Sequence, residues 1–282
     1  MTADTTPEAS AALADNTGAS GTAAFPRLLA MEWTKFRSVR STVFSLLAFV
    51  VLTLGLAALF TWLTVNQWDK IDADQRAAYQ RDAVGNILGG GFVLGQLAIC
   101  VLGAMVITSE YSTGMIRASL LAVPRRTPML AAKGLVFAAV TFVVGEVVSF
   151  GAFGIGAPIL HSKVPVSLSD HGVLRALLGA GLYLMMLGLF AMAIGALVRH
   201  TAGAITAVIG FVEVLAPLAQ LLPGSLGKHV HAYLPTEAGH LVAQSVQGPK
   251  DLLSPWQGYG VFSLWTAGLL IIAGWLLNRR DA

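Results

Sequence analysis

Six long stretches with almost no charged residue dominate this 282-residue sequence. Each stretch lies between two charged residues and contains 23 to 29 residues, and only Glu146 and Glu213 interrupt them. Because about 20 apolar residues in a helix cross the hydrocarbon core of a bilayer, the pattern predicts six transmembrane helices. The predicted helices cover about 43–65, 87–108, 132–158, 174–198, 203–222 and 258–277. The expected fold class is therefore an all-α integral membrane protein.

The composition excludes several other classes of protein. Only 12% of the residues are charged and 55% are hydrophobic, whereas a soluble domain carries about 25% charged residues. This argues against a large soluble enzyme and against a disordered protein. The net charge of +3 does not indicate a nucleic-acid partner, because the basic residues flank the apolar stretches. A single cysteine, Cys100, excludes an internal disulfide.

The chain divides into a short tail and a membrane domain. Residues 1–24 are mostly small and polar, so we expect a disordered tail, and we assign residues 25–282 to the six-helix domain. Six crossings place both termini on one side, and 11 of the 18 Lys and Arg residues fall on that side. Because cytoplasmic loops are enriched in Lys and Arg, the sequence predicts a multi-pass protein of the cell membrane with both termini in the cytoplasm.

The segment 25–41 precedes the first predicted crossing and has an amphipathic pattern. Trp33 and Phe36 supply apolar contacts, and Lys35 and Arg37 supply charges that reach lipid headgroups or water. The pattern favours an interfacial helix that lies on the inner leaflet and contacts lipid. The alternative is a cytoplasmic extension of the first membrane helix.

The segment 108–133, between the second and third predicted crossings, contains a second amphipathic pattern. Its apolar residues surround Arg117 and are Met115, Ile116, Leu120 and Leu121. Gly114 permits a sharp bend before them, and Pro124 ends the pattern. The segment therefore predicts a short helix on the cytoplasmic side that contacts a protein partner. The alternative is a helix that lies flat on lipid.

These residues resemble the permeases of ABC-2 type transporters. The resemblance rests first on the motif Glu110-Tyr111-x-x-Gly114-x-Ile116-Arg117, which continues through Leu120-Leu121 and Pro124-Arg125-Arg126 to Lys133. It rests also on Glu32-Trp33-Thr34-Lys35-x-Arg37-Ser38, which is similar to the start of many bacterial members. The order of amphipathic helix, six crossings and a long loop before the last crossing extends the resemblance over nearly the whole chain.

The resemblance implies how such a chain would work. It implies a permease subunit, most often of an exporter, that alternates between inward and outward openings, with the loop 109–124 as a coupling helix seated on an ATPase subunit. Five residues map onto that contact: Glu110, Tyr111, Gly114, Ile116 and Arg117. It also implies short re-entrant helices within 224–257, where an outer gate could lie, and a second permease subunit, as a homodimer or a related chain.

The chain lacks the sequence that binds a nucleotide phosphate. No G-x-x-x-x-G-K-[ST] motif occurs, and the only Gly-Lys pair, Gly227-Lys228, is followed by His229. We therefore expect a transport subunit rather than an enzyme, with no cofactor of its own, and with ATP and magnesium on a separate ATP-binding subunit.

Two carboxylates, Glu146 and Glu213, lie near the middle of the third and fifth predicted helices. A carboxylate in the bilayer is costly, so these residues predict a site for a cationic substrate or for protons, unless each is protonated and bonded to a neighbouring helix. They leave open a proton-coupled secondary transporter as the alternative function. An intramembrane enzyme is a further alternative, but it would need paired catalytic groups that the sequence does not show. A regulatory or assembly protein of the membrane, without transport, also remains open.

Three histidines and a carboxylate occur close together in the segment before the last crossing: His229, His231, Glu237 and His240. Their spacing matches no strong metal-binding signature. We expect ordinary surface histidines and no metal site.

Overall fold

The computed structural model describes residues 24–114, 126–249 and 251–279, and this part of the chain is helical without a strand. Six helical segments are long and apolar enough to cross a membrane, which confirms the predicted number. They are α3 (Arg40–Asn66), α5 (Ala83–Ser112), α7 (Arg126–Leu160), α8 (Val173–Val198), the continuous run of α9 (Thr201–Ile209), η1 (Gly210–Val214) and α10 (Leu215–Gln220), and α13 (Pro255–Arg279). The predicted disordered tail lies almost wholly outside the described residues.

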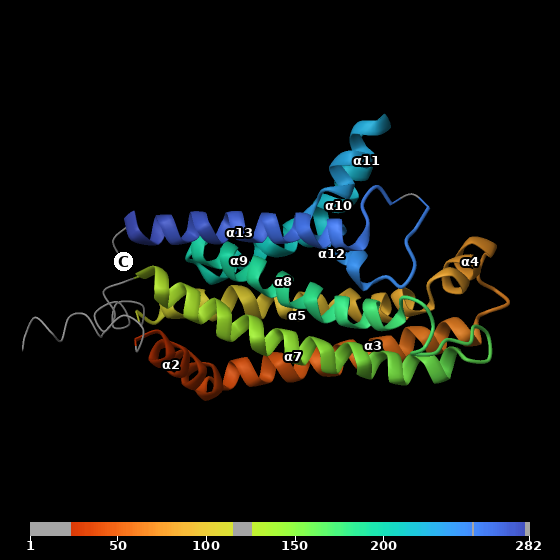
Figure 1. The fold of residues 1–282 in the computed structure, drawn as a ribbon, viewed down its shortest axis with the longest axis horizontal. Helices are drawn as coiled ribbons and strands as arrows, with labels where there is room; N and C mark the ends of the chain where they lie inside the picture. Colours follow the sequence, from red (N-terminus) through yellow and green to blue (C-terminus); the bar gives the residue numbers. More distant parts are fainter. Residues whose placement is uncertain (1–23, 115–125, 250, 280–282) are drawn as a thin grey trace, which may run out of the picture.

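The long helices pack side by side into a bundle whose two ends differ (Figure 1). One end, which we name the basal end, holds α2 (Ala24–Ser38), the end of α5 and the start of α7 (Figure 1). The last described residues of α13 lie at the same end. The opposite, distal end holds α4 (Ala73–Arg81) and the connections into α5, α8 and α13.

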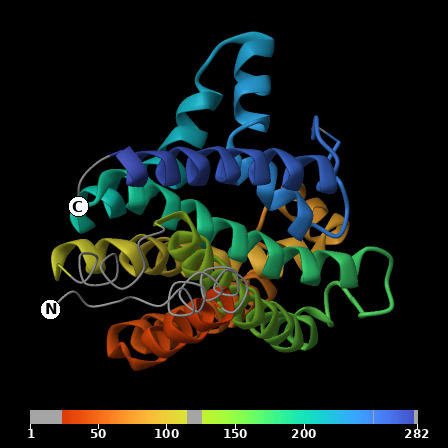
Figure 2. The ribbon, with the colours of Figure 1, turned by 60° about the vertical axis from the view of Figure 1, so that its left-hand side comes forward.

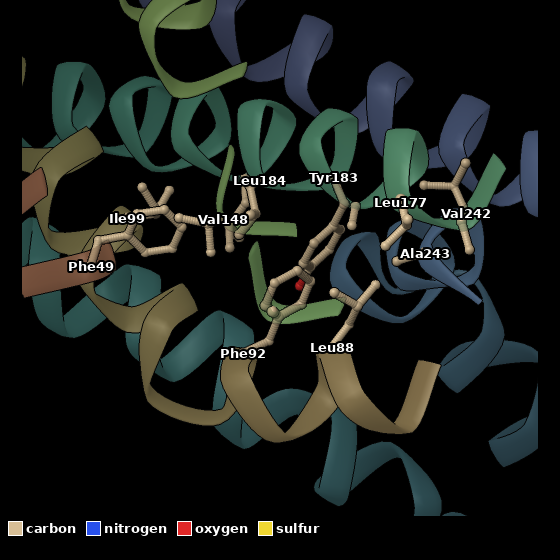
Figure 3. Close-up of a cluster of buried hydrophobic side chains, with 14 of the residues drawn as sticks. Phe49, Leu88, Phe92, Ile99, Val148, Leu177, Tyr183, Leu184, Val242 and Ala243 are labelled. Carbon is tan, nitrogen blue, oxygen red and sulfur yellow. The ribbon is translucent and has the colours of Figure 1, made fainter. Parts of the chain in front are cut away.

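Helix α8 forms the centre of the bundle, and two-thirds (67%) of its most apolar window is buried, the largest share among the six segments. It packs against α5, α7 and α13 (Figure 2). In the core, the ring of Tyr183 on α8 stacks on that of Phe92 on α5, with 6.1 Å between the ring centres (Figure 3). Gly103 lets α5 approach closely, because a Cβ there would overlap the carbonyl oxygen of Gly188 on α8.

Helix α3 has the opposite character, since only 17% of its most apolar window is buried. Large apolar side chains on its outer face, such as Phe44 and Val51, expose 68% and 67% of their surface. A soluble protein rarely exposes such a patch, so this face is suited to hydrocarbon.

Two short helices, α11 (Gly224–Ala232) and α12 (Pro235–His240), occur in the segment where the family resemblance implies re-entrant helices. Helix α12 and the following η2 (Leu241–Ala243) are largely buried and pack against α8 and α13. Helix α11 instead projects away from the bundle (Figures 1 and 2). The two short helices therefore face different surroundings.

Side chains at the starts of α5 and α8 bind the residues that follow η2. Asp82, whose carboxylate caps the start of α5, also accepts hydrogen bonds from the backbone and hydroxyl of Ser245. Arg175 of α8 donates to the carbonyl oxygens of Gln244 and Ser245 at 2.8 and 3.1 Å. Residues 244–245 are thereby fixed at the distal end of the bundle.

Candidate coupling site and intramembrane polar groups

Four charged side chains meet at the basal end, and we name them the Glu–Lys cluster: Glu32, Lys35, Glu110 and Lys133. The ammonium of Lys133 lies 2.6 Å from Oε2 of Glu32 and 2.8 Å from Oε1 of Glu110. The ammonium of Lys35 lies 3.1 Å from Oε1 of Glu32 and 3.2 Å from Oε1 of Glu110. The set therefore contains two positive and two negative groups, whose charges balance.

The cluster joins three segments that are far apart in the sequence. Glu32 and Lys35 are one turn apart on α2, Glu110 is in the last turn of α5, and Lys133 is in the second turn of α7. Glu32, Glu110 and Lys133 are 3%, 4% and 5% exposed. Because an unpaired charge at such a site is strongly unfavourable, the four groups depend on one another. A cavity of about 80 Å³ beside them is lined in part by Ser41, Ser45 and Ser109.

Lys35 is the least buried member, with 23% of its side chain exposed. Burial opposes its charge, but the nearby carboxylates of Glu110 and Glu32 outweigh this effect, and the pKa of Lys35 is raised above 10.5. The lysine that we expected to reach headgroups or water therefore faces the Glu–Lys cluster as a cation.

The cluster lies directly beside the predicted coupling loop. Helix α5 ends at Ser112, two residues after Glu110, and Gly114 follows with a φ of +71°. This backbone conformation favours glycine, as the predicted bend requires. Of the five residues predicted to contact an ATPase, Ile116 and Arg117 lie outside the described residues, and Gly114 is exposed. Glu110 is buried in the cluster, so its side chain holds the base of the loop.

Tyr111, the remaining residue of that set, connects α5 to the turn between α8 and α9. The guanidinium of Arg199 lies over its ring, 5.2 Å from the ring centre. One turn earlier, Thr108 accepts a hydrogen bond from Thr201 at 3.1 Å. The last turn of α5 therefore contacts the α8–α9 turn as well as α2 and α7.

Helix α2 forms where the sequence predicts the interfacial helix. Trp33 and Arg37 are exposed, whereas Phe36 turns inward and its ring centre lies 6.2 Å from that of Phe137 on α7. Contact of the outer face of α2 with lipid stays a prediction.

The two intramembrane carboxylates are not brought together. Glu146 on α7 faces α8, where a side chain at Gly181 would overlap its carboxylate, and its two carboxyl oxygens have no hydrogen-bond partner among the described residues. Glu213 is exposed and accepts a 2.8 Å hydrogen bond from Nε2 of Gln96 on α5. Each glutamate therefore has its own environment.

The histidines of the distal segment also differ from one another. His229 and His231 lie on the projecting α11, and Nε2 of His231 is 3.4 Å from Oε2 of Glu237. His240, which we expected at the surface, packs its ring against Tyr183 with 5.8 Å between ring centres. Among the described residues, no three His, Cys, Asp or Glu side chains are placed to hold a metal ion.

A protein-family model described as "ABC-2 family transporter protein" matches residues 28–216. The chain belongs to the ABC-2 transporter family. It is therefore a multi-pass membrane protein and the permease component of an ABC transporter. A comparison with curated protein sequences gave no match.

The region shared with the ABC-2 family contains the whole Glu–Lys cluster and both intramembrane carboxylates. It ends within α10, before α11, α12 and α13. The Glu–Lys cluster, Glu146 and Glu213 thus belong to the region shared with the family, whereas α11, α12 and α13 follow that region.

The sequence motifs of the ABC-2 resemblance contained all four members of the cluster but did not reveal their pairing. Glu32 and Lys133 are separated by 101 residues, so no local spacing connects them. One feature of the sequence could have indicated the cluster. Each of the segments that form α2, α5 and α7 has a charged residue at the edge of an apolar helix face, and these charges balance.

Proposed function

We propose that this ABC-2 permease works as an exporter driven by a separate ATP-binding subunit, with its basal end in the cytoplasm. The excess of Lys and Arg at this end supports the orientation. The same end carries the loop 109–124, which an ATPase could reach without crossing the membrane. The termini would then both be cytoplasmic.

The Glu–Lys cluster carries this proposal, because it gives the loop a mechanical connection to the membrane helices. A displacement of the loop pulls on the end of α5 through Glu110 and on the start of α7 through Lys133. Separating these groups would leave buried charges unpaired, at a cost of several kcal/mol, roughly 3–5 for a buried pair. The three segments therefore move together when ATP closes the ATPase subunits, and the helices change from an inward to an outward opening.

Two copies of the permease would form the complete pathway. The exposed carboxylate of Glu213 is unfavourable against lipid, so its surface requires water or protein beside it. Leucines are also exposed where α11 leaves the bundle (Figure 2). Leu221, directly after α10, and Leu226 on α11 expose 80% and 61% of their surface. We expect a second copy to cover these leucines and to leave Glu213 at the pathway between the two copies.

The test is to co-express the permease with a candidate ATP-binding subunit, chosen among the genes beside its own, and to purify the complex. The intact complex, in liposomes, should hydrolyse ATP and move a candidate substrate only when ATP is present. Arg117→Ala should reduce copurification of the ATPase, whereas the control Lys70→Ala, on the exposed distal turn, should not. Retention of the ATPase by Arg117→Ala removes this residue from the contact, and transport without nucleotide overturns the proposal.

A proton-coupled secondary transporter remains the second candidate, because the carboxyl oxygens of Glu146 are buried without a hydrogen-bond partner among the described residues. Such a group suits reversible protonation. This candidate predicts uptake driven by a pH gradient alone and its loss in Glu146→Gln. An unchanged rate in Glu146→Gln would exclude this role for the residue.

A further inference from the structure

We infer that the substrate of this permease is an amphipathic organic cation and that Glu213, held by Gln96, is its recognition site. The inference rests on the proposed transport function and adds the chemical class of the substrate. It starts from three polar side chains that meet in the middle of three membrane helices.

These side chains form a directed hydrogen-bond chain. The hydroxyl of Tyr183 on α8 donates to Oε1 of Gln96 on α5 at 3.0 Å, and Nε2 of Gln96 donates to Oε1 of Glu213 at 2.8 Å. Both bonds point toward the carboxylate. The carboxylate of Glu213 is therefore the terminal acceptor of this hydrogen-bond chain, and Gln96 fixes its position.

The backbone presents Glu213 outward. Residues 210–214 form a π-helical turn, in which the N–H of Leu215 donates to the carbonyl oxygen of Gly210, five residues earlier. Pro217 has no N–H to offer the carbonyl of Glu213, and its ring disfavours a regular α-helix there. Such widened turns are frequent at functional sites. The distortion and the exposed carboxylate coincide here, in the fifth membrane segment.

The carboxylate of Glu213 has no basic partner among the described residues. No salt bridge to Glu213 is formed within residues 24–114, 126–249 and 251–279, in contrast to the balanced Glu–Lys cluster. A carboxylate that is exposed in a membrane segment, with no cationic partner among the described residues, is suited to receive a cation from outside the chain.

The surroundings of Glu213 favour an organic cation over a metal ion. No group of three metal-ligating side chains occurs in the described part of the chain, and a metal ion needs several such ligands. Val93, one turn before Gln96, and Val214, beside Glu213, each expose 50% of their surface. A carboxylate beside exposed apolar side chains matches a cation with apolar substituents.

The test measures equilibrium binding of tetraphenylphosphonium to the purified full-length permease in lipid nanodiscs, with empty nanodiscs as the blank. Tetraphenylborate, which has the same shape and the opposite charge, separates recognition of charge from partition into lipid. We expect saturable binding of the cation only. Glu213→Gln should weaken it about tenfold or more, equivalent to about 1.4 kcal/mol.

Two further variants make the result specific. Gln96→Leu should weaken binding of tetraphenylphosphonium less than Glu213→Gln, because it removes the donor and leaves the charge. Asp74→Asn, which changes an exposed carboxylate on α4 outside the membrane helices, should bind as the unchanged protein does. A melting temperature close to that of the unchanged protein shows that each variant is folded, and Gln96→Leu carries the test if Glu213→Gln is unstable.

The inference is overturned if the unchanged permease binds no more tetraphenylphosphonium than empty nanodiscs, or if Glu213→Gln binds it equally. Neither result affects the proposed function, because ATP-dependent transport of another substrate class by the complex would still support it. Conversely, cation binding together with transport that needs no ATP would overturn the proposed function and leave the site.

Discussion

The ammonium of Lys133 contacts the carboxylate of Glu32 at 2.6 Å and thereby fixes α2 to the start of α7. Glu110 completes the set from the end of α5, at 2.8 Å from the same ammonium. The helix before the first crossing is therefore attached to both ends of the predicted coupling loop. An ABC-2 permease can use this attachment to transmit movement only if the charges remain together.

We predict that Lys133→Met destabilises the permease by about 3–5 kcal/mol, since it leaves two buried carboxylates with one cation. The measurement is the fraction unfolded as sodium dodecyl sulfate is added to the protein in mild detergent. Lys70→Met, at an exposed lysine of the distal end, is the matched control and should unfold like the unchanged protein.

The double variant Glu110→Gln/Lys133→Met tests the charge balance itself. It removes one charge of each sign and leaves Glu32 paired with Lys35, so it should be more stable than Lys133→Met alone. Equal stability of the single and double variants would show that lost packing, and not unpaired charge, causes the effect.

Gly103 allows the close approach of α5 and α8, and we predict that Gly103→Ala destabilises the bundle by about 1–3 kcal/mol. The added methyl group would overlap the backbone carbonyl of Gly188, which cannot rotate away. The control is Gly55→Ala on α3, where a Cβ has no neighbouring atom within 4 Å. That variant should be unchanged or up to about 1 kcal/mol more stable. A similar loss in both variants would contradict the packing argument.

The sequence predicts the six crossings well, because hydrocarbon requires long apolar helices and tolerates few charges. The same rule misjudges α7, which begins at Arg126 rather than near 132. A rule based on charge places the start of this helix near Lys133, but Glu32 and Glu110 neutralise that charge, and the helix begins before it. A limit based on charge alone fails where the partner lies on a distant segment.

The candidate sites were predictable to different degrees. The bend at Gly114 follows from the local sequence, and its positive φ confirms it. The hydrogen bond between Gln96 and Glu213 could not be predicted, because 117 residues separate them. A neutral glutamine is also not identified by a search for charged residues within apolar helices. Local patterns thus identify which residues are unusual, whereas their partners depend on helix packing.

Gly114 allows a direct test of the coupling loop. A residue with a Cβ is strained at a φ of +71°, by about 1–2 kcal/mol, but asparagine tolerates this conformation better than alanine. A Cβ at this position would meet no atom of the described chain within 4 Å, so conformation and not crowding distinguishes the variants. We predict that ATP-driven transport by the complex falls in Gly114→Ala and is retained better in Gly114→Asn. Equal activity of the two variants would exclude a role for the backbone bend.

His240 should make the stability of the permease depend on pH. Burial lowers the pKa of His240 below 6.5, although Glu237, Asp82 and Asp251 partly oppose this shift. The unfolded chain therefore binds a proton at a higher pH than the folded chain does. The stabilising contribution is complete above pH 6.5 and is lost as the pH falls toward the lowered pKa.

We predict that the melting temperature of the unchanged protein falls from about pH 7.5 to about pH 5. The melting temperature of His240→Asn should fall less, because asparagine does not titrate in this range. The same replacement at His171, an exposed residue in the α7–α8 connection, is the control for the loss of a histidine as such. It should keep the pH dependence of the unchanged protein, because it leaves the contact between His240 and Tyr183 in place. If His240→Asn follows the unchanged protein at every pH, the titrating group lies elsewhere, and the contact between His240 and Tyr183 has no part in acid sensitivity.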